Sequence, residues 1–282
     1  MALDVLSRHA CFGGTLGYYK HRSDAVDCDM RFAVYEPPRG RPGRLPVLYF
    51  LAGLTCTEET FVIKAGALEH AARHGLVLVA PDTSPRVQLP GDRESWDFGV
   101  AAGFYVNATQ SPWAPHYRMY SYVVEELPHV VASNFDVDPH RAGLFGHSMG
   151  GHGALTIGLR NPQKYRSLSA FAPIVAPTQV PWGTKAFSGY LGSNRDAWGD
   201  YDATELVRRG RKFPDEILID QGTADKFLAE QLRPELFAEA CNAAGQPLML
   251  NLREGYDHGY FFIQTFIGDH MTWHARRLSG PG

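Results

Sequence analysis

The chain has 282 residues, of which 44% are hydrophobic and 20% are charged, a composition that is typical of globular proteins and excludes intrinsic disorder. The formal net charge is −3 and the isoelectric point is near 6.4, which excludes a general attraction for nucleic acid or for anionic membranes. We predict a single domain over residues 1–282. The first 22 residues lack the apolar stretch of a signal peptide and no segment reaches transmembrane length, so we expect a cytoplasmic protein.

Short apolar runs along the chain predict strands, and helical patterns separate them. Residues 30–35 alternate between two kinds of side chain, which predicts an early antiparallel strand with two different faces. Later runs are apolar on both faces, as in strands covered by helices on both sides; they lie at 47–51, 76–80, 142–145, 217–219 and 248–252. Helical patterns lie at 61–74, 122–132, 149–159, 227–244 and 260–277. This alternation predicts a mostly parallel central sheet flanked by helices on both faces.

Two segments depart from this regular pattern. Pro128 falls inside the helical pattern at 122–132, where it removes a hydrogen bond, so we expect a kink or a new first turn there. Residues 175–201 are rich in Pro, Gly, Trp and Tyr and show no clear period. We interpret them as a long excursion of the kind that often carries a substrate pocket.

The nucleophile of an acyl-transfer enzyme is predicted at Ser148. Residues 146–150 read Gly-His-Ser-Met-Gly, which matches G-x-S-x-G directly after an apolar run and directly before a helical pattern. On such a tight strand-to-helix turn the hydroxyl stands clear of the backbone, and glycines leave room for the turn. The alternative is a glycine-rich helix start with a buried serine. Strand, turn and helix together favour the α/β-hydrolase fold.

An acid and a base are expected after later strands, in the chain order Ser, Asp, His. Asp225 follows the run at 217–219, whereas Asp220 comes too early in that strand. His258 follows the run at 248–252 and precedes the last helical pattern. We therefore predict His258 as the base and Asp225 as its orienting acid. Asp257 is the weaker candidate because neighbouring side chains tend to diverge.

Two backbone N–H groups are the expected donors to a reaction oxyanion. Met149 directly follows the nucleophile at a helix N-terminus, where free N–H groups and the helix dipole favour negative charge. The second donor in this fold usually follows an early strand. We assign it to Leu54, which follows the run at 47–51; an ordinary turn is the alternative.

No metal or cofactor is predicted. His270 and His274 are four residues apart on the last helical pattern, but no third ligand or HExxH motif accompanies them. We expect these two histidines to lie on a solvated helix face. The sequence contains no phosphate-binding or dinucleotide-binding glycine motif.

Long motifs then go beyond the fold and carry a resemblance to a known family. The motifs are residues 51–57 (LAGLTCT), 80–86 (APDTSPR), 94–99 (ESWDFG), 103–109 (GFYVNAT), 117–122 (YRMYSY), 145–154 (FGHSMGGHGA) and 255–258 (GYDH). Together they closely resemble the S-formylglutathione hydrolase family, also called the esterase D family, over nearly the whole chain. The catalytic positions of that family fall on Ser148, Asp225 and His258.

The resemblance implies a serine thioesterase that hydrolyses S-formylglutathione in formaldehyde removal, with side activity on small esters. It also implies a homodimer in the cytoplasm. Cys56 matches a family cysteine near the active site that is associated with sensitivity to thiol reagents; a buried structural thiol is the alternative. Because a formyl group is small, we predict a tight acyl pocket walled by Trp182 and by aromatic neighbours such as Trp96 or Phe98, with Cys56 also at the pocket. Core packing is the alternative for each of these aromatic residues. A general small-acyl carboxylesterase with the same triad remains the main alternative, and a binding protein that has lost the chemistry is a second one.

Overall fold

The computed structural model describes residues 3–40, 43–92 and 95–280. Their strands form one sheet in the order β1-β2-β3-β5-β4-β6-β7-β8-β9. The strands are β1 (Asp4–Cys11), β2 (Gly14–Ser23), β3 (Cys28–Glu36), β4 (Leu45–Leu51), β5 (Val77–Pro81), β6 (Val137–His147), β7 (Ser167–Phe171), β8 (Ile217–Gly222) and β9 (Leu248–Arg253). The first three strands are antiparallel, and β4 to β9 run parallel to one another. This sheet confirms the predicted fold class.

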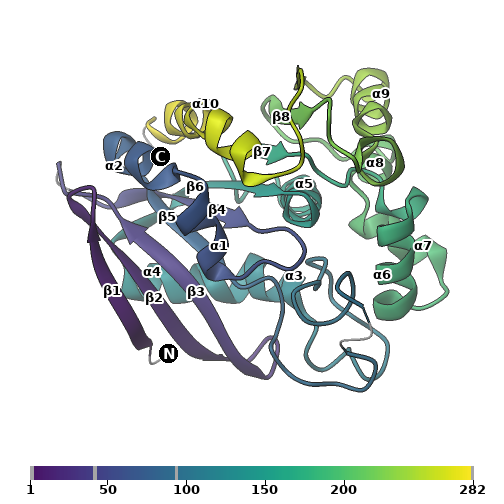
Figure 1. The fold of residues 1–282 in the computed structure, drawn as a ribbon, viewed down its shortest axis with the longest axis horizontal. Coiled ribbons are helices and arrows are strands. Elements are labelled where there is room, and N and C mark those ends of the chain that lie inside the picture. The colour runs from purple at the N-terminus through teal and green to yellow at the C-terminus, as the bar shows by residue number, and fades with distance from the viewer. Residues whose placement is uncertain (1–2, 41–42, 93–94, 281–282) are drawn as a thin grey trace.

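Helices cover both faces of the sheet. In Figure 1, α2 and α10 lie on one side of the sheet, and α4 and α5 lie on the other. The helices are α1 (Glu58–Lys64), α2 (Ala67–His74), α3 (Met119–Ser121), α4 (Leu127–Asn134), α5 (Met149–Arg160), α6 (Pro181–Leu191), α7 (Arg195–Trp198), α8 (Ala203–Arg208), α9 (Pro234–Ala244) and α10 (Tyr260–Leu278). Within the described residues, none of these helices combines the length and apolar character needed to cross a membrane.

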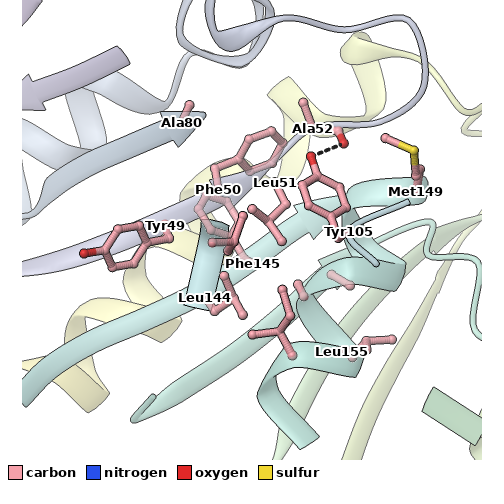
Figure 2. Close-up of a cluster of buried hydrophobic side chains, with 14 of the residues drawn as sticks. Tyr49, Phe50, Leu51, Ala52, Ala80, Tyr105, Leu144, Phe145, Met149 and Leu155 are labelled. Carbon is pink, nitrogen blue, oxygen red and sulfur yellow. Dashed lines mark hydrogen bonds between the residues drawn. The ribbon is translucent and has the colours of Figure 1, made fainter. Parts of the chain in front are cut away.

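The central strands carry the apolar core beneath the carboxyl edge of the sheet. Phe50 of β4 stacks on Phe61 with ring centroids 3.6 Å apart and meets Phe145 of β6 edge-on at 4.9 Å. Figure 2 shows Phe50 and Phe145 packed together just below the point where both strands end. Dense packing of this kind fixes the ends of β4 and β6 relative to each other.

Three predicted helices are each divided into two elements in the structure. Gly66 has φ 69° and separates α1 from α2. A π-helical turn, Tyr122–Glu126, precedes α4, which places Pro128 in the first turn of that helix, where its missing N–H is not needed. Arg233 has φ 50° and separates a second π-helical turn, Leu228–Leu232, from α9. The excursion at 175–201 is also more regular than expected, since it contains α6 and α7.

The prediction that His270 and His274 lie on a solvated helix face is wrong, because both side chains are fully buried against β7. The Ser169 hydroxyl lies 2.8 Å from His270 Nδ1 and 2.8 Å from His274 Nε2, and the Ser167 hydroxyl lies 2.6 Å from His274 Nδ1. Burial lowers the pKa of both histidines, so both remain neutral. Hydrogen bonds to the strand serines make this burial tolerable.

Candidate active site

Ser148 lies on a sharp turn between β6 and α5. Its backbone has φ 57° and ψ −118°, a strained conformation for a residue with a side chain. A Cβ atom on Gly150 would lie 1.9 Å from the Leu51 carbonyl oxygen, and one on Gly146 would lie 2.2 Å from the Gly150 carbonyl oxygen. Only glycine fits at these two positions. The turn that presents Ser148 therefore requires both glycines of the motif.

His258 and Asp225 meet at the ends of β9 and β8. His258 Nδ1 lies 2.6 Å from Asp225 Oδ2. Two further groups hold the carboxylate: the Phe227 N–H donates to Oδ1 at 2.8 Å, and Gln221 Nε2 donates to Oδ2 at 3.2 Å. With Nδ1 bonded to the carboxylate, Nε2 is the ring nitrogen available to a nucleophile.

The loops that carry these two residues are joined by their backbones. The Thr223 N–H donates to the Arg253 carbonyl at 3.0 Å, and the Ala224 N–H donates to the Tyr256 carbonyl at 3.0 Å. A Cβ atom on Gly222 would lie 2.2 Å from that Tyr256 oxygen. This close approach explains how Asp225 and His258, which are far apart in sequence, are held at hydrogen-bonding distance.

Ser148 and His258 line one cavity of about 190 Å³. Its walls are formed by Gly53, Leu54, Thr55, Cys56, Trp96, His147, Ser148, Trp182, Phe227 and His258. Apolar and aromatic groups therefore surround the serine, which is itself only 3% exposed. Such a lining suits a small apolar group.

The two expected oxyanion donors lie beside Ser148. Met149 is the first residue of α5, so its N–H has no acceptor within the helix. Leu54 lines the cavity in the loop after β4. In that loop the neighbouring N–H of Thr55 donates to Ala101 at 3.0 Å, whereas the Leu54 N–H makes no backbone hydrogen bond with the described residues. Both amides therefore remain available to a ligand.

Comparison with known proteins places this geometry in a family. The esterase family model matches residues 23–273. The S-formylglutathione hydrolase of Mus musculus is 54% identical over 281 residues, covering 99% of this chain and 100% of the mouse protein. That of Paracoccus denitrificans is 50% identical over 278 residues, covering 99% of each chain. The chain belongs to the S-formylglutathione hydrolase family.

Solved structures agree with this S-formylglutathione hydrolase family assignment. The S-formylglutathione hydrolase from Agrobacterium tumefaciens has 48% identity and a TM-score of 0.95, with 98% of this chain and 99% of that chain covered. A fluorophosphonate-binding serine hydrolase of Staphylococcus aureus shares the fold, with a TM-score of 0.76 at 19% identity and coverage of 93% and 98%.

The four residues predicted for the pocket of this S-formylglutathione hydrolase family member lie in two places. Trp96, Trp182 and Cys56 line the cavity, with the two tryptophan rings in edge contact at 5.6 Å. Phe98 is not among the lining residues. The Phe98 ring stacks on Tyr190 with centroids 4.5 Å apart and fills the space beside Gly189. Phe98 therefore packs in the core, which was the alternative for this residue.

Two aromatic residues that line the cavity of this family member, Phe227 and His147, were not predicted from the sequence. Phe227 contacts Trp182 at 4.6 Å and the His258 ring edge-on at 5.1 Å. The His147 ring lies 4.6 Å from the His258 ring, and neither of its two buried nitrogens has a hydrogen-bond partner among the residues that the structure describes. Burial, followed by the nearby His258, lowers the pKa of His147 well below its usual value. Its place inside the G-x-S-x-G motif was the available signal.

Cys56 is a partly buried thiol at the cavity wall. Burial raises the pKa of this thiol. The thiol is therefore mostly protonated at neutral pH, which slows its reaction with electrophiles.

Proposed function

We propose that Ser148 is the nucleophile, His258 the general base and Asp225 the acid that orients the base. The observation that carries this proposal is the 2.6 Å contact between His258 Nδ1 and Asp225 Oδ2, with His258 and Ser148 on the walls of one small cavity. The carboxylate fixes the tautomer that leaves Nε2 to accept the serine proton, and it stabilises the imidazolium that results.

We propose S-formylglutathione as the substrate, which is hydrolysed to formate and glutathione. Support comes from relatives of that name that are at least 50% identical over essentially their full length. A cavity of about 190 Å³ walled by Trp96 and Trp182 has room for a formyl group together with the thioester sulfur that carries it. The small cavity also predicts activity on small activated esters. With S-formylglutathione as substrate, the enzyme would catalyse one step of formaldehyde removal.

The reaction proceeds in two halves. His258 takes the proton of Ser148 as the serine oxygen attacks the thioester carbonyl, and the developing oxyanion is held by the N–H groups of Leu54 and Met149. Collapse of this intermediate breaks the carbon–sulfur bond, and the imidazolium returns its proton to the departing glutathione thiolate. Water, deprotonated by His258, then attacks the formyl-serine. As the carbon–oxygen bond to Ser148 breaks, the imidazolium returns its proton to the serine oxygen and formate is released. No metal or cofactor takes part in this scheme.

Location and assembly complete the proposal. We expect a cytoplasmic homodimer that binds neither nucleic acid nor membranes. Sedimentation at several protein concentrations tests the dimer, and a single species with the mass of one chain contradicts it.

A substrate panel tests the function directly. The ratio of kcat/KM for S-formylglutathione to kcat/KM for a small aryl acetate separates a dedicated thioesterase from a general carboxylesterase. The proposal expects this ratio to favour S-formylglutathione strongly and expects Ser148→Ala to abolish both activities. A ratio that favours the aryl acetate supports the carboxylesterase, and undiminished activity in Ser148→Ala overturns the nucleophile.

A further inference from the structure

The loop after β4 must hold the Leu54 N–H in place without regular secondary structure. β4 ends at Leu51 and α1 begins at Glu58. Within this interval Thr55 has φ 69°, a left-handed conformation that a side chain disfavours. Such a loop keeps one shape only if its surroundings determine it.

Tyr105 makes one of the contacts that hold this loop in place. Its hydroxyl donates to the Ala52 carbonyl at 2.9 Å, two residues before Leu54. Figure 2 shows this hydrogen bond at the end of β4, on the same side as Met149 at the start of α5. The side chain is 1% exposed, and burial raises the pKa of its hydroxyl well above the usual value, so the group remains a donor at all working pH values.

The same ring also packs on the helix that follows the nucleophile. A Cβ atom on Gly153 would lie 2.6 Å from Tyr105 Cδ2, so the ring contacts the backbone of α5 one turn after Met149. Tyr105 therefore touches both elements that carry an oxyanion donor, the loop through its hydroxyl and α5 through its ring.

The segment that carries Tyr105 is itself strained. Ala101, Phe104 and Tyr105 all have left-handed backbones, with φ of 63°, 48° and 50°. Ala101 also receives the Thr55 N–H at 3.0 Å. Two hydrogen bonds thus join this strained segment to the loop of Leu54, as expected where geometry is held for function.

We propose that Tyr105 is a positioning residue that sets the separation between the Leu54 and Met149 N–H groups. It touches no reacting atom and acts through the two donors. The inference rests on the proposed acyl-transfer function.

The test compares Tyr105→Phe, which keeps the ring and removes the hydroxyl, with the parent protein. Complete loss of one oxyanion donor costs about 10²–10³ in kcat, and a displaced donor costs less, so we expect kcat to fall by about tenfold. KM should change by less than about twofold, because ground-state binding is not involved. Affinity for a trifluoromethyl ketone, which adds to serine to give a tetrahedral oxyanion, should fall in parallel with kcat.

Matched controls separate positioning from stability. Tyr35→Phe removes another buried hydroxyl, which lies outside the candidate active site. This hydroxyl donates to the Cys11 carbonyl at 3.1 Å. Two substitutions on α5 form a matched pair. The methyl group of Gly153→Ala would lie 2.6 Å from Tyr105 Cδ2, and that of Gly158→Ala would lie 2.6 Å from Leu168 Cδ2. We expect Gly153→Ala to lower kcat and ketone affinity, and Gly158→Ala and Tyr35→Phe to lower only the melting temperature.

Unchanged kcat and ketone affinity in Tyr105→Phe overturn the inference, as does an equal loss in Tyr35→Phe and Gly158→Ala. If Tyr105→Phe does not fold, the kcat and ketone affinity of Gly153→Ala are compared with those of Gly158→Ala, and a loss confined to Gly153→Ala supports the inference. Assays with a small aryl acetate keep the two proposals separate. A parent protein that hydrolyses this ester but not S-formylglutathione contradicts the proposed substrate and leaves the role of Tyr105 testable.

Discussion

His258 Nδ1 and Asp225 Oδ2 lie 2.6 Å apart, although the two residues are 33 positions apart in the chain. The Asp257 carboxylate, adjacent to His258, instead accepts the Gly259 N–H at 2.8 Å. The histidine thus pairs with the acid at the end of the neighbouring strand rather than with the acid beside it in sequence.

This pairing predicts different effects for the two acids. Asp225→Asn should lower kcat by about 10⁴-fold, as loss of the acid's charge does in other Ser-His-Asp triads, because the ring loses its correct tautomer. Asp257→Asn should retain a kcat near that of the parent. Steady-state kinetics of both variants on S-formylglutathione check this, and the reverse order of effects would exclude Asp225 as the orienting acid.

The small cavity predicts a preference for short acyl groups that depends on Trp182. Trp182→Ala should raise kcat/KM for a butyryl ester relative to an acetyl ester by about tenfold, because the removed ring makes room for extra methylenes. Phe98→Leu is the control, since Phe98 packs on Tyr190 outside the cavity wall. A parent protein that hydrolyses long acyl esters without loss contradicts the small pocket.

Cys56 predicts slow, pH-dependent inactivation by thiol reagents. Because burial raises its pKa, the rate of inactivation by iodoacetamide should rise as the pH increases from 7 to 9. Cys56→Ser should resist the reagent. Cys241→Ser should remain as sensitive as the parent, because Cys241 is 1% exposed and burial raises its pKa to about 12. Equal sensitivity of Cys56→Ser and the parent would remove Cys56 as the reactive group.

Buried histidines predict a loss of stability at mildly acid pH. Burial lowers the pKa of His152 from 6.5 to about 4. Between these two pH values His152 is protonated in the unfolded chain but neutral in the folded chain. The free energy of unfolding therefore falls as the pH drops from 6.5 toward 4. His152 alone contributes up to about 3 kcal/mol to this fall. The raised pKa values of Glu58 and Asp202 act in the opposite direction.

A variant isolates this contribution from the opposing ones. His152 Nε2 lies 2.9 Å from the Phe104 carbonyl, and His152→Gln keeps a donor for that oxygen without a titrating group. Urea unfolding at pH 7 and pH 5 should show a smaller difference in this variant than in the parent, whereas exposed His140→Gln should behave like the parent. An identical pH difference in parent and His152→Gln would contradict the assignment.

The parts of the site that sequence predicts are those with strong local requirements. Gly146 and Gly150 occupy positions where any side chain would strike backbone, so the nucleophile turn is visible in the sequence. Asp225 and His258 follow strands whose apolar runs are equally visible, and their chain order is set by the sheet. The sequence therefore predicts the positions of the residues for which we propose the catalytic roles.

The missed features depend on partners distant in sequence. β7 has the sequence Ser-Leu-Ser-Ala-Phe, which lacks an unbroken apolar run because both serines are satisfied by buried histidines of α10. For the same reason His270 and His274 resemble exposed residues in the sequence. Phe98 and Trp182 are both aromatic residues near glycines, and only packing determines which of them faces the cavity.

Labelling of Ser148 tests the central claim most directly. The protein is treated with a serine-directed phosphonate, the modified peptide is found by mass spectrometry, and the remaining hydrolysis of S-formylglutathione is measured in the same samples. We predict one phosphonate per chain, on Ser148, with activity falling in proportion to the labelled fraction. Full labelling of Ser148 with S-formylglutathione hydrolysis intact, or loss of that activity with Ser148 unlabelled, would contradict the account.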